Sequence, residues 1–450
     1  MGQMMAMPLV APLFLEDSQF SSTLSLVNVS NLNTYATVTV RSLSGQSILQ
    51  KQFPLPPSSA TVIGMQQLLQ EANSTETRGS FVVEQSPELK GMVVLAQLSL
   101  TYQGSRASYI DEELAMPDPN MGSSTLRGVA RGKAKSTLIA ISSLSQTTQK
   151  IQVDCLKENA NPDSKIVSLP ANATLITNAC GGDLNSQSLA SIPEEPEQDE
   201  SLGASAIGIQ FISSAGPGQF AAFGLTRRRA SGGVLFGAVP FNDPKLAVSP
   251  STVFAGVPVG AADLLGPGLY MPYAAVANFS QRPAHVSVNF SRTSGAPGAA
   301  IASNTLVRQI ILQPLHTRVV FLREIQGDPS LRNSFVVTSD VGPGEMAASM
   351  ASKEANGSAE VELLGKDAQQ PENAGGHPWS VAQGTESTLL IFNHTDKGQR
   401  VKINIPTGRG LWEELIKLSP FETLSISMSE LIKDQVKDDN QLTLPPDLVG

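Results

Sequence analysis

The sequence has few residues of the kinds that usually carry chemistry. Among 450 residues there are only four histidines, two cysteines and two tryptophans, aromatic residues make up 5% and charged residues 16%. No two histidines stand at the spacing of a metal site, and the HExxH, Walker, GxSxG and EF-hand patterns are absent. The sequence therefore gives no specific reason to propose catalysis, a cofactor or a metal ion, and we expect a protein that is not an enzyme.

Positive charge is also scarce. The chain has 31 basic and 40 acidic residues, a formal net charge of -9, which argues against a phosphate-binding surface and excludes nucleic acid as an expected partner. The longest apolar run near the start, from Met4 to Leu15, is too short to span a bilayer. We interpret it as a leading β-strand and predict no membrane insertion. We expect an export signal upstream of these residues, and hence a periplasmic, cell-surface or extracellular location.

Turn-forming residues are abundant, with 37 glycines and 30 prolines, and they separate short runs in which apolar residues recur at every second position. One phrase occurs four times, as "STLSLVNVS", "STLIAISSLS", "YAAVANFS" and "STLLIFNHT", each time followed by a second alternating run. Two such runs joined by a short polar turn predict a β-hairpin. The anchors Asn28, Ser142, Asn278 and Asn393 are 114, 136 and 115 residues apart, which is the size of one β-sandwich domain.

Two further phrases accompany the first. A Pro-containing turn, at Pro56, Pro170, Pro314 and Pro420, precedes another strand, and short helices are expected near Met65–Gln70 and Ser429–Val436. A strand, a Gly/Pro turn and another strand then predict a second hairpin, but only in the first three copies. The fourth copy therefore looks truncated, and we expect self-association or completion by another chain there.

These repeats predict four domains. They are a sandwich over 1–116 with the leading strand, a sandwich over 117–245 with an acidic loop insertion, a sandwich over 246–365, and an incomplete sandwich over 366–450. Since the connecting segments are short, neighbouring domains should touch. The predicted class is all-β, made of tandem antiparallel sandwiches with short helices.

The two cysteines both fall in the second copy. Cys155 shares the inward parity of its strand and Cys180 ends the strand after the Pro turn. A bridge between them would close a 25-residue loop and contribute ~3 kcal/mol in the loop-entropy model. In an exported protein we expect this disulfide, with two buried free thiols as the alternative.

The remaining candidate residues have ordinary structural explanations. Trp379 and Trp412 form a sugar-stacking platform if exposed, whereas packing is the commoner fate of so few large aromatics. Seven N-x-S/T sequons are explained by turn chemistry. The carboxylates of Asp111 to Glu113 and of Glu194 to Glu200 are interpreted as solvated, and Arg227 to Arg229 as surface charges that discourage edge pairing.

The strand phrase, the Pro turn and the "GPGxxAA" segment together resemble the repeated immunoglobulin-like β-sandwich modules of large secreted or surface proteins of bacteria. The resemblance implies a structural or interaction protein that serves as a spacer, adhesion unit or assembly surface, with a protein or glycan partner. The alternative is a carbohydrate-binding accessory region of a larger secreted hydrolase, in which Trp379 and Trp412 would contact the sugar.

Overall fold

The structure is a computed structural model that describes residues 8–57, 59–86, 94–103, 107–113, 122–158, 160–180, 205–230, 233–261, 269–322, 325, 332–354, 360–363, 365–369, 379, 381, 386–407, 410–446 and 448. Over these ranges the regular elements are antiparallel strands, two short α-helices and one 3-10 turn, so the chain is all-β. The described part of the chain has no helix both long and apolar enough to cross a membrane.

Strand pairing joins the strands into four groups in chain order, and each group is called a module below. Module 1 has two four-stranded sheets, ordered β1-β6-β3-β4 and β5-β2-β7-β8. Its elements are β1 (Leu9–Leu15), β2 (Phe20–Asn28), β3 (Thr34–Ser42), β4 (Ser47–Leu55), β5 (Ser59–Gly64), α1 (Met65–Glu71), β6 (Arg78–Gln85), β7 (Val94–Gln103) and β8 (Ala107–Glu113).

Module 2 repeats this order in its sheets β9-β14-β11-β12 and β13-β10-β15-β16. Its elements are β9 (Thr125–Ala130), the 3-10 turn η1 (Ala134–Ser136), β10 (Thr137–Ser143), β11 (Gln149–Leu156), β12 (Asp163–Leu169), β13 (Thr174–Asn178), β14 (Ile207–Ser213), β15 (Phe220–Ala230) and β16 (Gly233–Val239).

Module 3 keeps the order and adds two short strands, β18 and β26. Its sheets are β21-β20-β23-β17-β26 and β18-β19-β24-β25, with β22 also paired to β19. Its elements are β17 (Ser251–Ala255), β18 (Gly260–Ala261), β19 (Leu269–Asn278), β20 (Ala284–Ser294), β21 (Ile301–Leu312), β22 (Thr317–Phe321), β23 (Asn333–Ser339), β24 (Met346–Glu354), β25 (Glu360–Leu363) and β26 (Lys366–Asp367). The strand β26, which the sequence placed in the fourth domain, pairs here with β17.

Module 4 has only two two-stranded sheets among its described residues, β27-β30 and β28-β29. Its elements are β27 (Thr388–Phe392), β28 (Gln399–Thr407), β29 (Gly410–Leu418), β30 (Thr423–Ser427) and α2 (Met428–Lys433). The helix α2 starts one residue earlier and ends three residues earlier than predicted. The Ser427 hydroxyl accepts a hydrogen bond from the backbone N–H of Glu430 at 3.1 Å, which caps its start.

The predicted hairpins are wrong in their pairing. The strands of the first phrase, β2 and β3, do not pair with each other, because β2 pairs with β5 and β7 while β3 pairs with β4 and β6. The same holds for β10 and β11, for β19 and β20, and for β27 and β28. The "second hairpin" strands β6 and β7 also lie in opposite sheets. Each polar turn therefore carries the chain across the core instead of back along one sheet.

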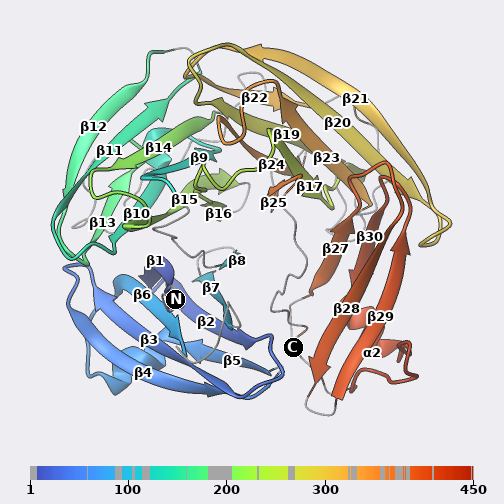
Figure 1. Cartoon of the computed structure of the whole chain (residues 1–450), viewed down its shortest axis with the longest axis horizontal. Helices are drawn as coiled ribbons and strands as arrows, with labels where there is room; N and C mark the ends of the chain where they lie inside the picture. The colour runs from blue at the N-terminus through green and yellow to red at the C-terminus, as the bar shows by residue number, and fades with distance from the viewer. Residues whose placement is uncertain are drawn as a thin grey trace, which may run out of the picture.

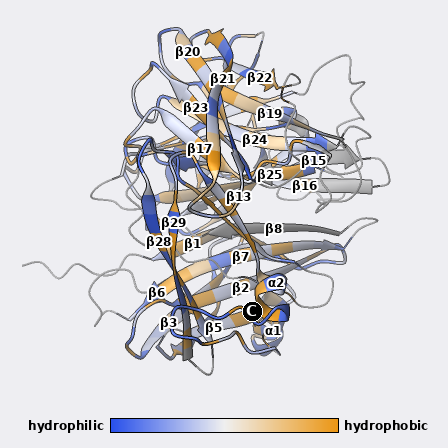
Figure 2. Ribbon diagram, turned by 90° about the vertical axis from the view of Figure 1, so that its right-hand side faces the viewer, coloured by the Kyte–Doolittle hydropathy of each residue, from blue (hydrophilic) through white to orange (hydrophobic). Residues whose placement is uncertain are grey.

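The core of each module lies between its two sheets. In module 1, Leu24 and Leu26 from β2 face Val38 and Val40 from β3, together with Phe81 from β6, and all five are at most 1% exposed. Figure 2 shows hydrophobic and hydrophilic residues alternating along the strands. Period two thus places one set of side chains inside and the other outside, as the sequence predicts.

Some strands are buried on both faces because successive modules pack on one another. All seven residues of β10 are buried: Ile139 and Ile141 belong to the core of module 2, whereas Leu138 and Ala140 pack into the core cluster of module 1. In β19 the residues Ala275 and Ala277 likewise contact module 2. The near-continuous apolar runs "TLIAI" and "YAAVA" reflect this double burial.

A threonine stands at each junction, and we call the three the seam threonines. Thr174, Thr317 and Thr423 are the first residues of β13, β22 and β30, just after the Pro turn, and each is at most 2% exposed. Each donates its backbone N–H to the preceding module. The bonds are Thr174 N to Leu43 O at 2.9 Å, Thr317 N to Lys157 O at 3.3 Å and Thr423 N to Thr293 Oγ1 at 2.8 Å. The modules therefore meet through one repeated contact.

Figure 1 shows the consequence for the whole molecule. The four modules follow one another around an arc, from module 1 in blue to module 4 in red. The repeated seam explains the curvature. Because equivalent contacts join each module to the one before it, each module is rotated in a similar direction relative to that neighbour.

Candidate interaction surface

Among the described residues, module 4 has strand edges with no neighbour where the other three modules have one. The strands β2, β10 and β19 each have a neighbour on both sides, and so do β3, β11 and β20. Their equivalents β27 and β28 each pair with a single strand of the described chain, β30 and β29 respectively. An unpaired edge presents a row of backbone donors and acceptors to which another strand can bind.

Side-chain burial agrees with this difference in pairing. Along the central strand β3, inward residues are buried and outward residues are half-buried. Along β28 the outward residues Arg400, Lys402 and Asn404 are all exposed, and the inward Val401 is only half-buried. The deeper Ile403 and Ile405 are 8% and 5% exposed. The edge of β28 therefore borders a partly open apolar face.

The direction of the free backbone groups follows from the opposite edge of the same sheet. On β29 the N–H groups of Glu413 and Leu415 point away from β28, because they donate to the carboxylates of Asp438 and Asp439 at 2.8 and 2.9 Å. In an antiparallel ladder, two residues that lie opposite each other either both direct their N–H and C=O groups toward the partner strand or both direct them away from it. Asn404 and Lys402 lie opposite Glu413 and Leu415, so their N–H and C=O groups point to the free edge.

The two edges of the β28-β29 sheet therefore differ. The Asp438 and Asp439 carboxylates cover the β29 edge, and Asp439 also donates its N–H to the Glu413 carbonyl at 3.1 Å. Desolvation raises the pKa of Asp438, but hydrogen bonds from the N–H groups of Glu413, Leu442 and Asn440 outweigh it and hold that pKa below its ordinary value. For the backbone groups of Lys402 and Asn404 no described residue provides such a cover.

The candidate sugar-binding tryptophans belong to the core of module 4. Trp412 is 2% exposed, packs with Ile403, Ile416 and Leu424, and donates its indole N–H to the Val436 carbonyl at 3.3 Å. Trp379 is half-buried against the same cluster. The structure brings the two together, but Trp412 has no free ring face on which a sugar could stack.

The two cysteines are joined. Cys155 and Cys180 form a disulfide with their Cα atoms 5.6 Å apart, and Cys155 is fully buried in the core of module 2. The bridge links Cys155 near the end of β11 to the second residue after β13, and these two strands belong to opposite sheets.

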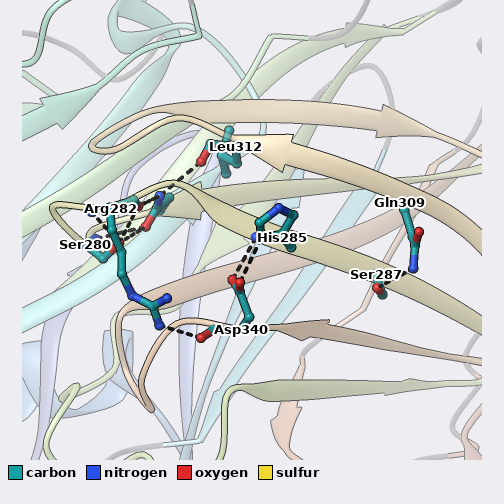
Figure 3. A network of polar contacts seen from close by, with 8 residues as sticks. Ser280, Arg282, His285, Ser287, Gln309, Leu312 and Asp340 are labelled. Atoms are coloured by element: carbon teal, nitrogen blue, oxygen red, sulfur yellow. Dashed lines mark hydrogen bonds and ion pairs between the residues drawn. The ribbon is translucent and has the colours of Figure 1, made fainter.

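The histidines do not converge on one another. His285 is exposed and its Nδ1 lies 2.8 Å from the Asp340 carboxylate, as Figure 3 shows, while Arg282 donates to the Asp340 backbone carbonyl. His316 Nδ1 lies 2.7 Å from the Pro314 carbonyl, and His394 stacks edge-on near Phe392. His377 lies outside the described residues. Among the described residues no three His, Cys, Asp or Glu side chains come together as a metal site.

The sequons in the polar turns are structural. Asn28, Asn278 and Asn393 are at most 4% exposed, and the side-chain amide of each donates to carbonyls across the turn and at the Pro turn. Each side-chain oxygen accepts from the backbone and hydroxyl of the Ser or Thr two residues later. In module 2 the equivalent position is Ser143, not Ser142. The backbone N–H of Ser143 donates to the carbonyl of Ala173, the residue before Thr174.

The arginine run and the two carboxylate clusters singled out in the sequence are only partly described by the structure. Arg227 is 9% exposed, so its interpretation as a surface charge is wrong, while the side chains of Arg228 and Arg229 lie outside the described part. The carboxylates of Asp111 to Glu113 and of Glu194 to Glu200 also lie outside it.

Two features were missed from the sequence. The seam threonines follow the Pro turn in modules 2 to 4, and this pattern was a readable signal; the equivalent position of module 1, opposite Val27, is Ala60. The second is a polar concavity of about 340 Å³ between modules 1 and 2, lined by Arg41, Gln50, Glu84 and Asn172 among others. Burial lowers the pKa of Arg41 there, against the opposing charge of Glu84.

No protein-family model matches this sequence, and no curated protein matches it either.

Proposed function

We propose that this chain is a non-enzymatic structural protein of the bacterial cell surface or periplasm, in which immunoglobulin-like sandwiches form a stiff curved array that presents binding edges. The observation that carries the proposal is the repeated seam. Direct packing and one recurrent threonine contact join each module to the next, which suits a spacer or assembly element.

The sheet order supports the immunoglobulin-like part of the proposal. In such sandwiches the second and fifth strands share one sheet, the third and sixth share the other, and the chain crosses the core between the second and third. The pairs β2 with β5 and β3 with β6 follow this order. The first and seventh strands are exchanged, since β1 joins β6 and β7 joins β2.

The disulfide supports the proposed location, because bridges of this kind persist in oxidising compartments. The alternative of a carbohydrate-binding region depended on exposed tryptophans, and the burial of Trp412 gives it no support.

A glycine at a seam provides the test. A Cβ on Gly208 would lie 2.7 Å from both the Ala277 Cβ and the Thr317 Oγ1 of module 3, whereas a Cβ on Gly64 would meet nothing. We expect small-angle X-ray scattering to show a single arc for the wild type and for Gly64→Ala, and an expanded particle for Gly208→Ala. Wild-type scattering that requires freely jointed modules would refute a stiff array.

A further inference from the structure

We propose that the free edge of β28 binds an extended polypeptide segment of the pattern Phe-aliphatic-aliphatic-acid from a partner protein, which completes the sheet by strand addition. The inference deepens the proposed function and rests on it. The argument comes from the three complete modules, which show what occupies the equivalent edge and in which register.

The occupant of this edge is the same kind of strand in modules 1 and 3. There β6 and β23 contain the sequences "SFVVE" and "SFVVT", and each buries a phenylalanine and an aliphatic residue completely: Phe81 and Val83, and Phe335 and Val337. Module 2 uses β14, with Phe211 and Ile209 fully buried. Each complete module thus places one aromatic and one aliphatic residue of this strand in its core.

The register transfers directly to module 4. The first residues of β3, β20 and β28 have equivalent hairpin partners, since Thr34, Ala284 and Gln399 lie opposite Leu55, Leu312 and Leu418. Counting from these residues, Val38 and Val40 correspond to Ile403 and Ile405. Because Val38 pairs with Val83 and Val40 with Phe81, an incoming strand would place its aliphatic residue at Ile403 and its phenylalanine at Ile405.

The backbone bonds transfer as well. The carbonyls of Tyr35, Lys150 and His285 accept hydrogen bonds from the backbone N–H groups of Ser86, Ser214 and Asp340, which directly follow the occupying strand in modules 1, 2 and 3. The equivalent carbonyl in module 4 belongs to Arg400. It points to the free edge, as the backbone groups of Lys402 and Asn404 do. Pro406 has the same parity and no N–H, so the row of donors on this edge stops at Asn404.

Charge favours an occupying strand with the acidic residue of β6, SFVVE, over one with the neutral residue of β23, SFVVT. Glu84 of β6 lies opposite Thr37, and the residue equivalent to Thr37 on β28 is Lys402, which is exposed and whose ammonium lies 2.6 Å from the Glu413 carboxylate of β29, so an acidic residue of the incoming strand would be its second anionic partner. A cross-strand pair of opposite charge stabilises a sheet modestly, so an acidic residue after the two aliphatic ones fits this edge better than a neutral one.

The test uses the whole chain and a synthetic peptide with the sequence of residues 78–86, RGSFVVEQS. The only two tryptophans of the chain, Trp379 and Trp412, both lie in the core cluster of module 4, so their fluorescence reports on this module alone. We expect saturable binding with a change in tryptophan emission, and slower hydrogen exchange at Lys402 and Asn404. A peptide with serine in place of its phenylalanine and second valine should bind at least a hundredfold more weakly.

Matched variants of the protein locate the edge. Asn404→Pro removes an N–H that points away from β29, so β28-β29 pairing survives, and the affinity should fall at least tenfold. Asn404→Ala should bind as the wild type does. Lys402→Glu should weaken the peptide about threefold, and a peptide with lysine in place of its glutamate should recover that loss.

Three results would overturn the proposal. They are the absence of any fluorescence or exchange change at saturating peptide, equal affinity for Asn404→Pro and Asn404→Ala, and a wild-type dimer that Asn404→Pro converts to a monomer. The dimer would make a second copy the occupant. None of the three affects the scattering test of the seams, so the array could stand if the edge proposal fails.

Discussion

At the scale of single residues, buried polar side chains hold the turns that cross each core. Asn28 is fully buried, and its amide donates to the carbonyls of Leu32, Leu55 and Pro56 at 2.8 to 3.0 Å. One side chain thus ties the crossing turn to the Pro turn, which lies far along the chain. Buried polar groups stabilise only when all their partners are present, so these positions should be sensitive to truncation.

Replacing Asn393 should therefore destabilise module 4. Asn393→Ala leaves the carbonyls of Lys397 and Ser419 without their donor, and we expect the free energy of unfolding of this module to fall by about 2 kcal/mol. Denaturant unfolding followed by tryptophan fluorescence measures the loss in this module. The exposed Asn404 gives the control, and a similar midpoint for Asn404→Ala and Asn393→Ala would contradict the role assigned to Asn393.

The disulfide should stabilise module 2 in a local way. The double variant Cys155→Ala/Cys180→Ala removes a bridge across a 25-residue loop, for which the loop-entropy model gives a loss of ~3 kcal/mol. We expect faster hydrogen exchange in β11 and β13, with β3 and β20 unchanged. Mass spectrometry of the unreduced wild type should show the linked peptides, and free thiols in the natively folded protein would refute the bridge.

At the scale of elements, the sequence predicts strands well and their partners poorly. Alternation in "TYATVTV" places Ala36, Val38 and Val40 inside, as the structure has them. Alternation contains no information on which strand lies alongside, and a connection as short as 29–33 suits a crossing turn as well as a hairpin. The double burial of β10 left a visible trace in its continuous apolar run, but only a neighbouring module explains it.

The candidate surface could be predicted in part. The missing third phrase predicted an incomplete module 4, and within the part of the chain that the structure describes β27 and β28 each have one neighbour where their equivalents in modules 1 to 3 have two. The carboxylates that cover β29 were not predictable, because Asp438 and Asp439 follow α2 in an irregular segment whose path depends on tertiary contacts.

The cover on β29 should loosen in acid. Since the folded-state pKa of Asp438 lies below that of the unfolded chain, its carboxylate stabilises the fold above the unfolded pKa, and this contribution disappears as the pH falls through the folded-state pKa. We expect hydrogen-exchange protection at Glu413 to drop over that range. Asp438→Asn should show weaker protection already at neutral pH. Asp396→Asn, in an exposed turn, is the matched control, and equal protection in both variants would contradict the cover.

At the scale of the whole molecule, charged side chains cross the seam between modules 2 and 3. Arg131, which follows β9, is 5% exposed, donates to the Met350 carbonyl at 2.7 Å and lies 3.9 Å from the Glu360 carboxylate. Arg127 donates to the Gly344 carbonyl at 2.6 Å, and burial lowers its pKa despite the nearby charge of Glu345. Such groups are costly to bury alone, so they couple the two modules energetically.

Removing Arg131 should uncouple these modules. Arg131→Ala leaves Glu360 buried without this cation, and losing one partner of a buried pair costs about 3 kcal/mol. We expect calorimetry to resolve separate transitions for modules 2 and 3 where the wild type shows one. The double variant Arg131→Met/Glu360→Gln should recover much of the loss. A single unshifted transition for Arg131→Ala would show that the seam does not depend on this pair.

The crossing turns also set the order in which the molecule can be built. Since β1 pairs with β6, Leu15 meets its partner Arg78 only after most of module 1 has been synthesised. Proteins dominated by such distant pairings fold slowly, whereas adjacent strands such as β3 and β4 can join at once. Each module must therefore leave the ribosome nearly whole before it closes. The next one then finds a finished face on which to dock, so the arc grows from its N-terminal end.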